Sequence, residues 1–314
     1  MRVVFMGTPD FAVGTLKKLA KSEHQVLAVV TQPDKPKGRG KAMQFTPVKE
    51  AALESGIPVL QPVKVRDPQV VEELQALNPD VIVVVAFGQI IPESILNMPK
   101  YGCVNVHASL LPMYRGAAPI QWAVINGDKT SGVTTMQMDK GLDTGDMLLK
   151  REVILDPEET GGSLFDRLSE VGAELLIETL EKLERNEIIP EKQPELSPTP
   201  YASQMTMDMG RIDWNQDAVK IERLIRGLNP WPSAYTQLGE KTLKIWVAQV
   251  EEGDSKKEAG TVIRADKKGL FVQTGKGVLK ILELQLEGKK RMTADAFLRG
   301  YPIREETVLG TDIC

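Results

Sequence analysis

Short apolar segments alternate with longer amphipathic segments through the first half of the chain. The run DVIVVVA at Asp80–Ala86 is almost continuously apolar, which is typical of a central parallel strand covered on both faces. The pattern predicts strands over Arg2–Met6, His24–Thr31, Asp80–Ala86, Gly102–Val106 and Ser131–Met138, and helices over Phe11–Ala20, Pro47–Ser55, Val70–Leu77, Ala118–Ile125 and Gly161–Arg185. This alternation predicts an α/β fold with a doubly wound, Rossmann-like, mostly parallel sheet.

The pattern changes after residue 188. Residues 189–200 (IPEKQPELSPTP) hold four prolines and few apolar side chains, which is typical of a stiff, extended linker. A helix is then predicted over Ala218–Gly227, followed by short strands over Ala234–Leu238, Thr242–Val250, Gly260–Arg264, Leu270–Gln273 and Val278–Leu284. Short, closely spaced strands favour a small OB-like β-barrel. We therefore expect a catalytic domain over 1–188, a linker over 189–205 and a second domain over 206–314.

Composition narrows the function classes. The chain has 314 residues with two cysteines and two histidines, too few for an ordinary zinc site, so we expect no metal. No apolar stretch is long enough to span a membrane, and the N-terminus reads as a strand and turn rather than a signal peptide, so we expect a cytoplasmic protein. The net charge of −4 argues against nucleic-acid binding unless local clusters provide it.

One such local group is Asn105-Val106-His107, at the predicted end of a strand. Ligands of open parallel sheets bind beyond the carboxyl ends of the strands, and residues i and i+2 of a strand point to the same side. An amide donor can stabilise a developing oxyanion, and an imidazole can transfer a proton. The pair Asn105 and His107 therefore suits acyl transfer, although such a pair alone is more often a strand cap.

An acyl-transfer site of this kind also needs a carboxylate to orient the imidazole. The segment MDKGLDTGDML offers Asp139, Asp143 and Asp146 in a glycine-rich loop. If the preceding strand is parallel to its neighbours, this loop opens on the same edge as His107. Flexibility and reach favour Asp143, which lies between two glycines, but the pattern leaves all three open.

A basic segment follows the second predicted strand. QPDKPKGRGKAMQFTP carries Lys35, Lys37, Arg39 and Lys41, and its prolines and glycines predict an irregular loop. Alternating cations in a mobile loop suit phosphate contacts, although a solvated loop is the commoner case. The second domain has further basic runs at 267–268 and 289–291.

The segment VNVHASLLPMYRGAAPIQWAVINGD, followed by GVTTMQMDKGLDTGDML, resembles the 10-formyltetrahydrofolate-dependent formyltransferases. MGTPDFAV, QPDKPKGRGK and RGLNPWPSAYT are similar to the branch of this family that acts on methionyl-tRNA. The resemblance covers essentially the whole chain.

The resemblance implies transfer of a formyl group from 10-formyltetrahydrofolate to the free amino group of methionine esterified to initiator tRNA, for translation initiation. It implies Asn105, His107 and Asp143 as the catalytic residues and no metal. It places the folate at Ser109, Leu110, Leu111 and Pro112. It assigns Lys35, Lys37, Arg39 and Lys41 to tRNA, with Arg39 the main contact. We expect a monomer.

Three alternatives stay open at this point. A related formyltransferase acting on glycinamide ribonucleotide or a nucleotide-linked amino sugar would use the same Asn, His and Asp. A dinucleotide-binding dehydrogenase is disfavoured because the first turn, GTPDFAVG, is not G-x-G-x-x-G. A noncatalytic RNA-binding protein is disfavoured by the spacing of the three polar residues. Residues that select methionine also stay open, with Met113, Arg115 and Trp122 as candidates.

Overall fold

The computed structural model describes residues 1–37 and 42–310. Its internal contacts divide the chain into two compact units. The first comprises residues 1–119, 130–154 and 165–202, and the second comprises residues 120–129, 155–164 and 203–314. The domain limits expected from the proline-rich segment stay a prediction.

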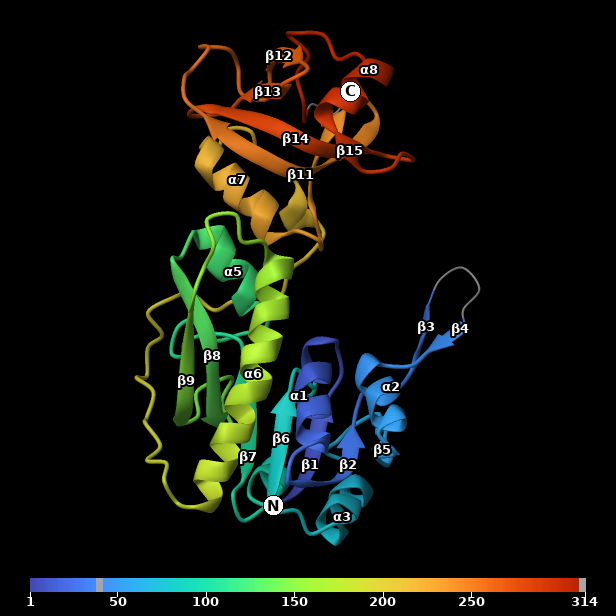
Figure 1. Ribbon diagram of the computed structural model, residues 1–314, viewed down its shortest axis with the longest axis vertical. Coiled ribbons are helices and arrows are strands. Elements are labelled where there is room, and N and C mark those ends of the chain that lie inside the picture. Colours follow the sequence, from blue (N-terminus) through green and yellow to red (C-terminus); the bar gives the residue numbers. More distant parts are fainter. Residues whose placement is uncertain (38–41, 311–314) are drawn as a thin grey trace. The chain divides into compact units, whose positions relative to one another are not determined.

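The first unit is built on a seven-stranded sheet with strand order β5-β2-β1-β6-β7-β8-β9 (Figure 1). Its strands are β1 (Arg2–Gly7), β2 (Gln25–Val30), β5 (Val59–Leu60), β6 (Val81–Val85), β7 (Cys103–His107), β8 (Thr130–Gln137) and β9 (Met147–Ile154). The five strands from β5 to β7 are parallel, and β8 and β9 are antiparallel to their neighbours. The predicted doubly wound, mostly parallel sheet is confirmed.

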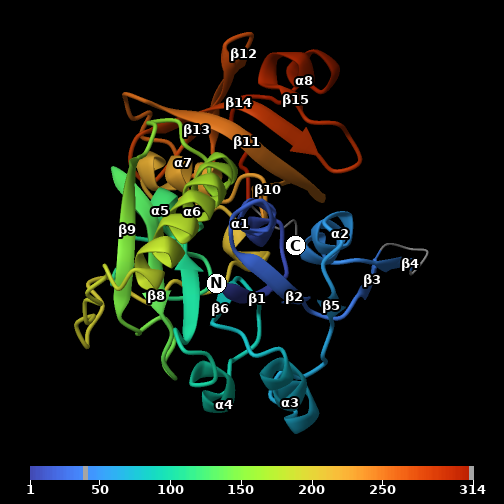
Figure 2. The same ribbon diagram turned by 60° about the horizontal axis from the view of Figure 1, so that its bottom comes forward.

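Helices cover both faces of this sheet (Figure 2). They are α1 (Phe11–Ala20), α2 (Pro47–Glu54), α3 (Pro68–Ala76), α4 (Glu93–Leu96) and α6 (Gly161–Glu184). On one face, α3 and α4 supply Leu74 and Ile95 to a core that contains Val4, Ile82 and Cys103. On the other face, α1 and α6 meet through the edge-to-face rings of Phe11 and Phe165, 5.3 Å apart. Burial on both faces explains why β6 is apolar at every position.

The helix α6 packs closely against β7 and β8 because of a glycine. A side chain at Gly172 would lie 3.0 Å from Val106 and 3.6 Å from Val133, so the helix could not come this near with a larger residue. Since Val106 faces α6, the alternation along β7 sends Asn105 and His107 to the opposite face, together with Cys103.

The direction of β8 differs from the prediction. Thr134 pairs with His107 and Gln137 with Val104, so β8 runs antiparallel to β7 and ends beside the start of that strand. The argument that the following loop opens on the edge carrying His107 was therefore wrong. Met138, the first residue after β8, packs on the core face that carries Cys103, so the loop folds back along that face. The edge strand β9 was not predicted, because three of its eight positions are exposed and charged residues interrupt it.

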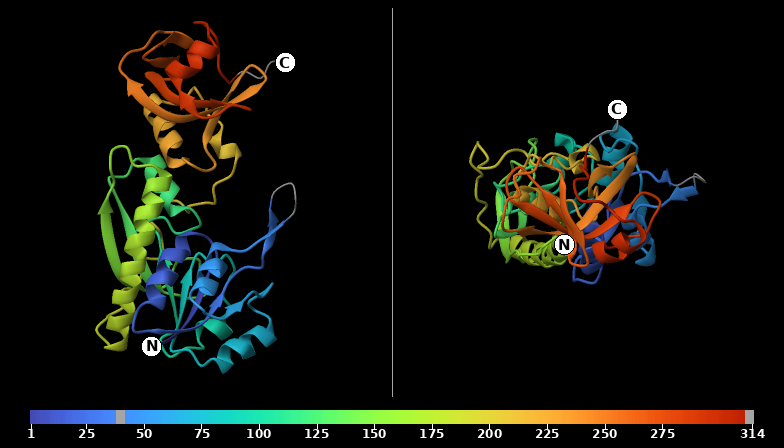
Figure 3. Two further views of the ribbon diagram at one scale, coloured as in Figure 1. Left: turned by 45° about the vertical axis from the view of Figure 1, so that its right-hand side comes forward. Right: turned by 90° about the horizontal axis from the view of Figure 1, so that it is seen from above.

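The basic segment was also predicted wrongly at its two ends. Residues Lys35–Lys37 (β3) and Ala42–Gln44 (β4) form an antiparallel pair rather than an irregular loop. Two views show this hairpin projecting away from α2 and the sheet of the first unit (Figures 1 and 3). Arg39 and Lys41 lie outside the described residues.

The second unit contains a six-stranded antiparallel sheet with the path β10-β11-β14-β13-β12 and β15 paired with β14. Its strands are β10 (Ala234–Leu238), β11 (Lys241–Glu251), β12 (Val262–Asp266), β13 (Gly269–Gln273), β14 (Val278–Leu286) and β15 (Met292–Thr293). Its helical elements are α5 (Pro119–Asn126), η1 (Asp208–Gly210), α7 (Ala218–Gly227) and α8 (Ala294–Gly300). The expected small OB-like β domain is confirmed.

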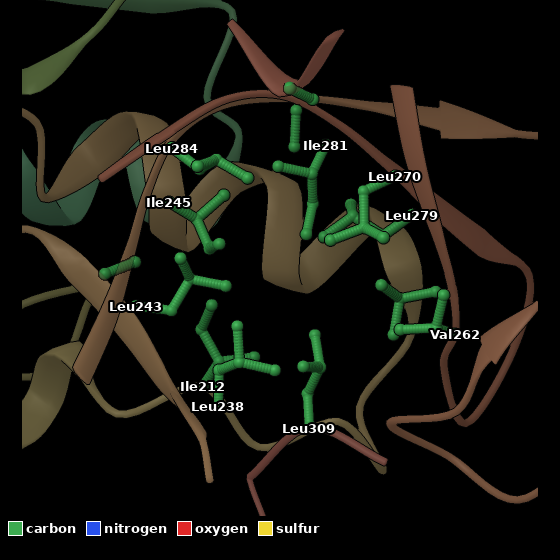
Figure 4. Packing of buried hydrophobic residues seen from close by; sticks show 14 of the residues in the cluster. Ile212, Leu238, Leu243, Ile245, Val262, Leu270, Leu279, Ile281, Leu284 and Leu309 are labelled. Carbon is green, nitrogen blue, oxygen red and sulfur yellow. The ribbon is translucent and has the colours of Figure 1, made fainter. Parts of the chain in front are cut away.

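Aliphatic side chains fill the interior of this second unit (Figure 4). Leu243 and Ile245 from β11 meet Leu279, Ile281 and Leu284 from β14, all at most 1% exposed. Only alternate residues of each strand point inward, which explains the alternating pattern of the sequence here. The unit therefore has its own core.

Candidate active site

The carboxyl end of β7 carries the two polar residues that the sequence singled out. His107 is the last residue of the strand and is 7% exposed, while Asn105 is half-buried. Both project from the face covered by α3 and α4, because they alternate with Val104 and Val106, which point to the face covered by α6. The structure thus places an amide and an imidazole in one region.

Both nitrogens of the His107 ring face oxygen atoms. The Nε2 atom lies 3.0 Å from the backbone carbonyl oxygen of Tyr114, and Nδ1 lies 3.7 Å from Oδ1 of Asp143. A carbonyl oxygen can only accept, so Nε2 carries a hydrogen in this bond. Nδ1 is therefore the nitrogen that can take up or release a proton, and it lies beside the carboxylate of Asp143.

The carboxylate of Asp143 is fixed by the backbone. Its Oδ2 accepts a hydrogen bond of 2.9 Å from the N–H of Gly116, and its own carbonyl oxygen accepts one of 2.9 Å from Gln193. Asp143 has a φ of 56°, in the left-handed region that is uncommon for residues other than glycine. The fold-back of the loop and this left-handed turn bring the side chain to His107.

The other two acidic residues of the loop lie differently. Oδ1 of Asp139 accepts bonds of 2.9 Å from the N–H of Gly141 and from the hydroxyl of Thr144, so Asp139 closes a turn within its own loop. Asp146 accepts a bond from Gln137 through its backbone carbonyl. Of the three candidates, Asp143 is the one that the structure brings to His107.

In the side chain of Asn105, the amide nitrogen donates one hydrogen bond, whereas the amide oxygen accepts none among the described residues. Nδ2 donates to the carbonyl oxygen of Val84 at 3.3 Å, and Oδ1 is buried without a hydrogen-bond partner among the described residues. Buried polar atoms without a partner are rare, and each calls for an explanation such as a ligand or a bound water. Asn105 can thus offer an acceptor and its second N–H to a bound molecule.

The turn after β7 is held by β8. Thr134 donates to the carbonyl oxygen of Ser109 at 2.7 Å and accepts from the N–H of Leu111 at 3.0 Å. The side chain of Leu111 is 1% exposed and packs against Met136 and Met147, while Leu110 is partly exposed. Pro112 follows Leu111 through a cis peptide bond. The structure therefore places Leu111 in the core and leaves Leu110 nearer the surface.

Sequence reasoning did not find Tyr114, Thr134 or Gln193 as parts of this site. Tyr114 acts through a backbone carbonyl, which any residue would provide. Thr134 lies within a strand that alternates normally, and Gln193 lies in a segment that the prolines marked as a linker. No local pattern marks such contacts.

The root of the β3–β4 hairpin is a compact polar cluster. Lys49 makes a 2.5 Å ion pair with Asp34, and Gln61 donates to the same carboxylate at 2.7 Å. The Lys49 ammonium also lies 3.8 Å from the ring centre of Phe45. Hydrogen bonds from Lys49 and Gln61 hold the pKa of Asp34 below its ordinary value. Beyond this root, Lys35 is exposed.

The basic run at 289–291 is partly neutralised. Arg291 bonds to Glu283 at 2.6 Å and lies 5.1 Å from the ring centre of Trp246. Its guanidinium is therefore less available to a polyanion than the sequence indicated.

Within residues 1–37 and 42–310, no group of three or more His, Cys, Asp or Glu residues could hold a metal ion. In that same part of the chain, no helix combines the length and the apolar character needed to cross a bilayer.

Two family matches cover most of the chain. Residues 1–180 match the formyl transferase family, and residues 204–302 match the formyl transferase C-terminal domain. Two similar proteins are named methionyl-tRNA formyltransferase. That of Agathobacter rectalis is 59% identical over 307 residues, covering 97% of this chain and 98% of the relative. That of Caldanaerobacter subterraneus is 54% identical over 310 residues, covering 98% of this chain and 100% of the relative.

Solved structures share the fold at low identity. The methionyl-tRNA formyltransferase from Clostridium thermocellum aligns with a TM-score of 0.54 and 20% identity, over 81% of this chain and 95% of that one. HypX from Aquifex aeolicus in complex with tetrahydrofolic acid aligns with a TM-score of 0.63 and 20% identity, over 97% of this chain and 48% of that one.

Proposed function

The chain belongs to the methionyl-tRNA formyltransferase family, and from that premise we propose which of its residues carry out the reaction. The resemblance predicted from the sequence is confirmed. The protein is an enzyme that transfers a formyl group to methionyl-tRNA, giving the N-formylmethionyl-tRNA used in translation initiation. The proposal concerns the catalytic residues, the formyl donor and the tRNA contacts.

His107 takes the proton that the amino group of methionine loses as it attacks the formyl carbon, and it returns this proton to N10 of the folate as the bond between N10 and the formyl carbon breaks. The geometry that supports this role is the pair of contacts of the ring. Nε2 donates to the Tyr114 carbonyl, and Nδ1 is left to accept a proton beside Asp143. The 3.7 Å between Nδ1 and the Asp143 carboxylate is close enough to stabilise the imidazolium that forms. The carbonyl of Tyr114, rather than Asp143, thus selects the tautomer.

Asn105 acts on the formyl oxygen and on the attacking amine. Its second Nδ2 hydrogen donates to the formyl oxygen as negative charge develops there. Its buried Oδ1 accepts an N–H of the amine and orients the lone pair toward the formyl carbon. The observation that carries this proposal is that Oδ1 is buried without a partner among the described residues. A bound substrate satisfies it.

The formyl donor is a folate, and we assign it as 10-formyltetrahydrofolate. Ser109, Leu110, Leu111 and Pro112 form the wall next to His107 on which it binds. Leu110 supplies an apolar contact, while Leu111 shapes the wall from within the core. The hydrogen bond that Thr134 donates to Ser109 and the one that it accepts from Leu111 hold this wall rigid before any ligand arrives.

Initiator methionyl-tRNA binds through the cations of the segment 35–41, which are Lys35, Lys37, Arg39 and Lys41. The anchored root at Asp34 and Lys49 and the projection of the hairpin support this assignment (Figure 3). Lysine and arginine side chains on a projecting element can reach phosphates that a flat acidic surface would repel. We propose further that the enzyme is a cytoplasmic monomer, with domain limits at 188 and 206.

The direct test mixes the purified enzyme with methionyl-tRNA and 10-formyltetrahydrofolate and scores formylmethionine after hydrolysis of the ester. We expect turnover with 10-formyltetrahydrofolate and none with 5-formyltetrahydrofolate, whose formyl group is on another nitrogen. Glycinamide ribonucleotide serves as the competing acceptor. Faster formylation of glycinamide ribonucleotide than of methionyl-tRNA would overturn the assignment of the acceptor.

A further inference from the structure

The proline-rich segment is bonded along its length to the catalytic unit. We call residues 191–202 the strap. At one end, Glu191 and Met147 exchange two backbone hydrogen bonds, of 2.8 and 2.9 Å. At the other end, the N–H of Ala202 donates to the carbonyl oxygen of Arg115, and its own carbonyl accepts from Ala117, both at 2.8 Å. The strap runs beside β8 and β9 (Figure 1, yellow).

Gln193 lies in the strap, and both the nitrogen and the oxygen of its side-chain amide form hydrogen bonds to residues outside the strap. Its Nε2 donates to the carbonyl oxygens of Asp143 at 2.9 Å and Gly145 at 2.8 Å, and its Oε1 accepts from Arg115 at 2.9 Å. Arg115 is 7% exposed and also donates to the carbonyl oxygen of Pro194 at 2.7 Å. A buried guanidinium strongly requires acceptors, so it fixes Gln193 in place. Gln193 in turn fixes the backbone of the Asp143 loop.

Thr199 makes the matching contact on the other side of His107. Its hydroxyl oxygen accepts from the N–H of Tyr114 at 2.7 Å, and the nearby Ser197 donates to the carbonyl oxygen of Pro112 at 2.8 Å. Tyr114 is the residue whose carbonyl accepts from Nε2 of His107. The strap therefore bonds to the residue on each side of the imidazole.

Both of those residues have strained backbones. Asp143 has a φ of 56° and Tyr114 a φ of 55°, and neither is glycine. Such conformations persist where many surrounding contacts hold the backbone in place, and they are concentrated at functional sites. The bond from Gln193 and the bond to Thr199 are the contacts by which the strap holds these two strained turns.

We propose that Gln193 and Thr199 are positioning residues for formyl transfer. Gln193 holds Asp143 toward Nδ1 of His107, and Thr199 holds the Tyr114 carbonyl toward Nε2. The proposal rests on the proposed function of His107 and Asp143. The segment that the sequence marks as a linker is in this view a structural part of the active site.

The first test compares Gln193→Ala and Gln193→Glu with the wild-type enzyme. Glutamate keeps an oxygen that accepts from Arg115 but has no N–H to donate to the two carbonyl oxygens. It therefore separates the acceptor role of the amide from its donor role. We expect kcat to fall roughly tenfold in both variants, with the KM for methionyl-tRNA within about threefold of wild type. Gln75→Ala, the same change at an exposed glutamine on α3, should leave kcat unchanged.

A double-mutant cycle separates positioning from general stability. If Gln193 acts through Asp143, Gln193→Ala should cost little further activity in the Asp143→Asn background. A purely structural loss would multiply with the loss from Asp143→Asn. Additive free-energy changes in this cycle, or wild-type kcat in Gln193→Glu, would overturn the role of Gln193.

The second test uses Thr199→Val and Thr199→Ser. Valine has nearly the shape of threonine without the acceptor, whereas serine keeps the hydroxyl. We expect kcat to fall several-fold in Thr199→Val and to return toward wild type in Thr199→Ser. Equal activity of the two variants contradicts the role of Thr199. A wild-type enzyme with no formyl transfer at all would instead contradict the proposed function itself.

Discussion

The end of β7 and the β3–β4 hairpin are both candidate sites, and the two are built in opposite ways. The imidazole of His107 is buried and has an oxygen at each nitrogen, one from Tyr114 and one from Asp143. Hydrogen bonds with Gly116, Gln193 and Thr199 in turn hold these two residues. The hairpin is fixed at its root by Asp34 and projects beyond it. Proton transfer requires atoms placed within a few tenths of an ångström, whereas phosphate attraction acts over several ångströms.

This difference determines what a substitution should do. A change at the end of β7 should act on kcat, because the reacting geometry is lost while most of the binding surface remains. A change in the hairpin should act on the KM for tRNA and on its salt dependence, because long-range attraction is lost while the chemistry remains. The following predictions test that division, beginning with the largest effect.

The largest effect is expected from Asp143→Asn. Removing the negative charge beside Nδ1 of His107 should lower kcat by about a hundredfold or more while the protein stays folded. Asp139→Asn is the matched control, because Asp139 bonds within its own loop. Single-turnover rates with saturating methionyl-tRNA measure the effect. Equal loss in both variants would mean that the loop, and not the contact with His107, matters.

The next effect is expected from Arg39→Ala, in the segment between β3 and β4. The KM for methionyl-tRNA should rise about tenfold with little change in kcat. The slope of log affinity against log salt should fall by about one unit or slightly less for each phosphate contact removed. Lys64→Ala, at an exposed lysine outside the hairpin, is the control. An unchanged salt slope in Arg39→Ala would remove the hairpin from the tRNA interface.

A smaller effect is expected from Asp34→Asn at the root of the hairpin. The bonds from Lys49 and Gln61 lower the pKa of Asp34, so its carboxylate stabilises the folded protein above the ordinary pKa of about 4. That contribution is lost as pH falls through the lowered folded value. Denaturation midpoints of the wild type should therefore fall toward those of Asp34→Asn as pH falls below the ordinary pKa of about 4. Parallel curves for the two proteins over that range would contradict the assignment.

The smallest effect concerns Cys103, two residues before Asn105. It is fully buried, and burial raises the pKa of its thiol to about 12. We expect no alkylation of Cys103 by iodoacetamide in the native enzyme at pH 8, and full alkylation in denaturant. Mass spectrometry of the peptide around Cys103 measures this. Rapid labelling of the native enzyme would show that the end of β7 opens far more readily than its packing implies.

The sequence alone predicted most of the elements of both units. Continuous apolar runs such as Val81–Val85 and the alternating strands of the second unit follow from burial on two faces or one, which local periodicity records directly. It did not predict β9, an edge strand interrupted by charges. It also missed the hairpin strands β3 and β4, whose glycines and prolines indicated an irregular loop.

The candidate site likewise has a part that the sequence predicted and a part that only the tertiary structure decided. The spacing of Asn105 and His107 is a property of one strand, so the sequence itself determined that the amide and the imidazole share a face. The resemblance to the formyltransferases likewise rested on motifs of neighbouring residues. The tertiary structure decided that β8 is antiparallel, that Asp143 rather than Asp139 reaches His107, and that the strap holds Tyr114 and Asp143. The physical reason is that these contacts join distant segments largely through backbone N–H and carbonyl groups, which are the same in nearly every residue and so leave no pattern in the sequence.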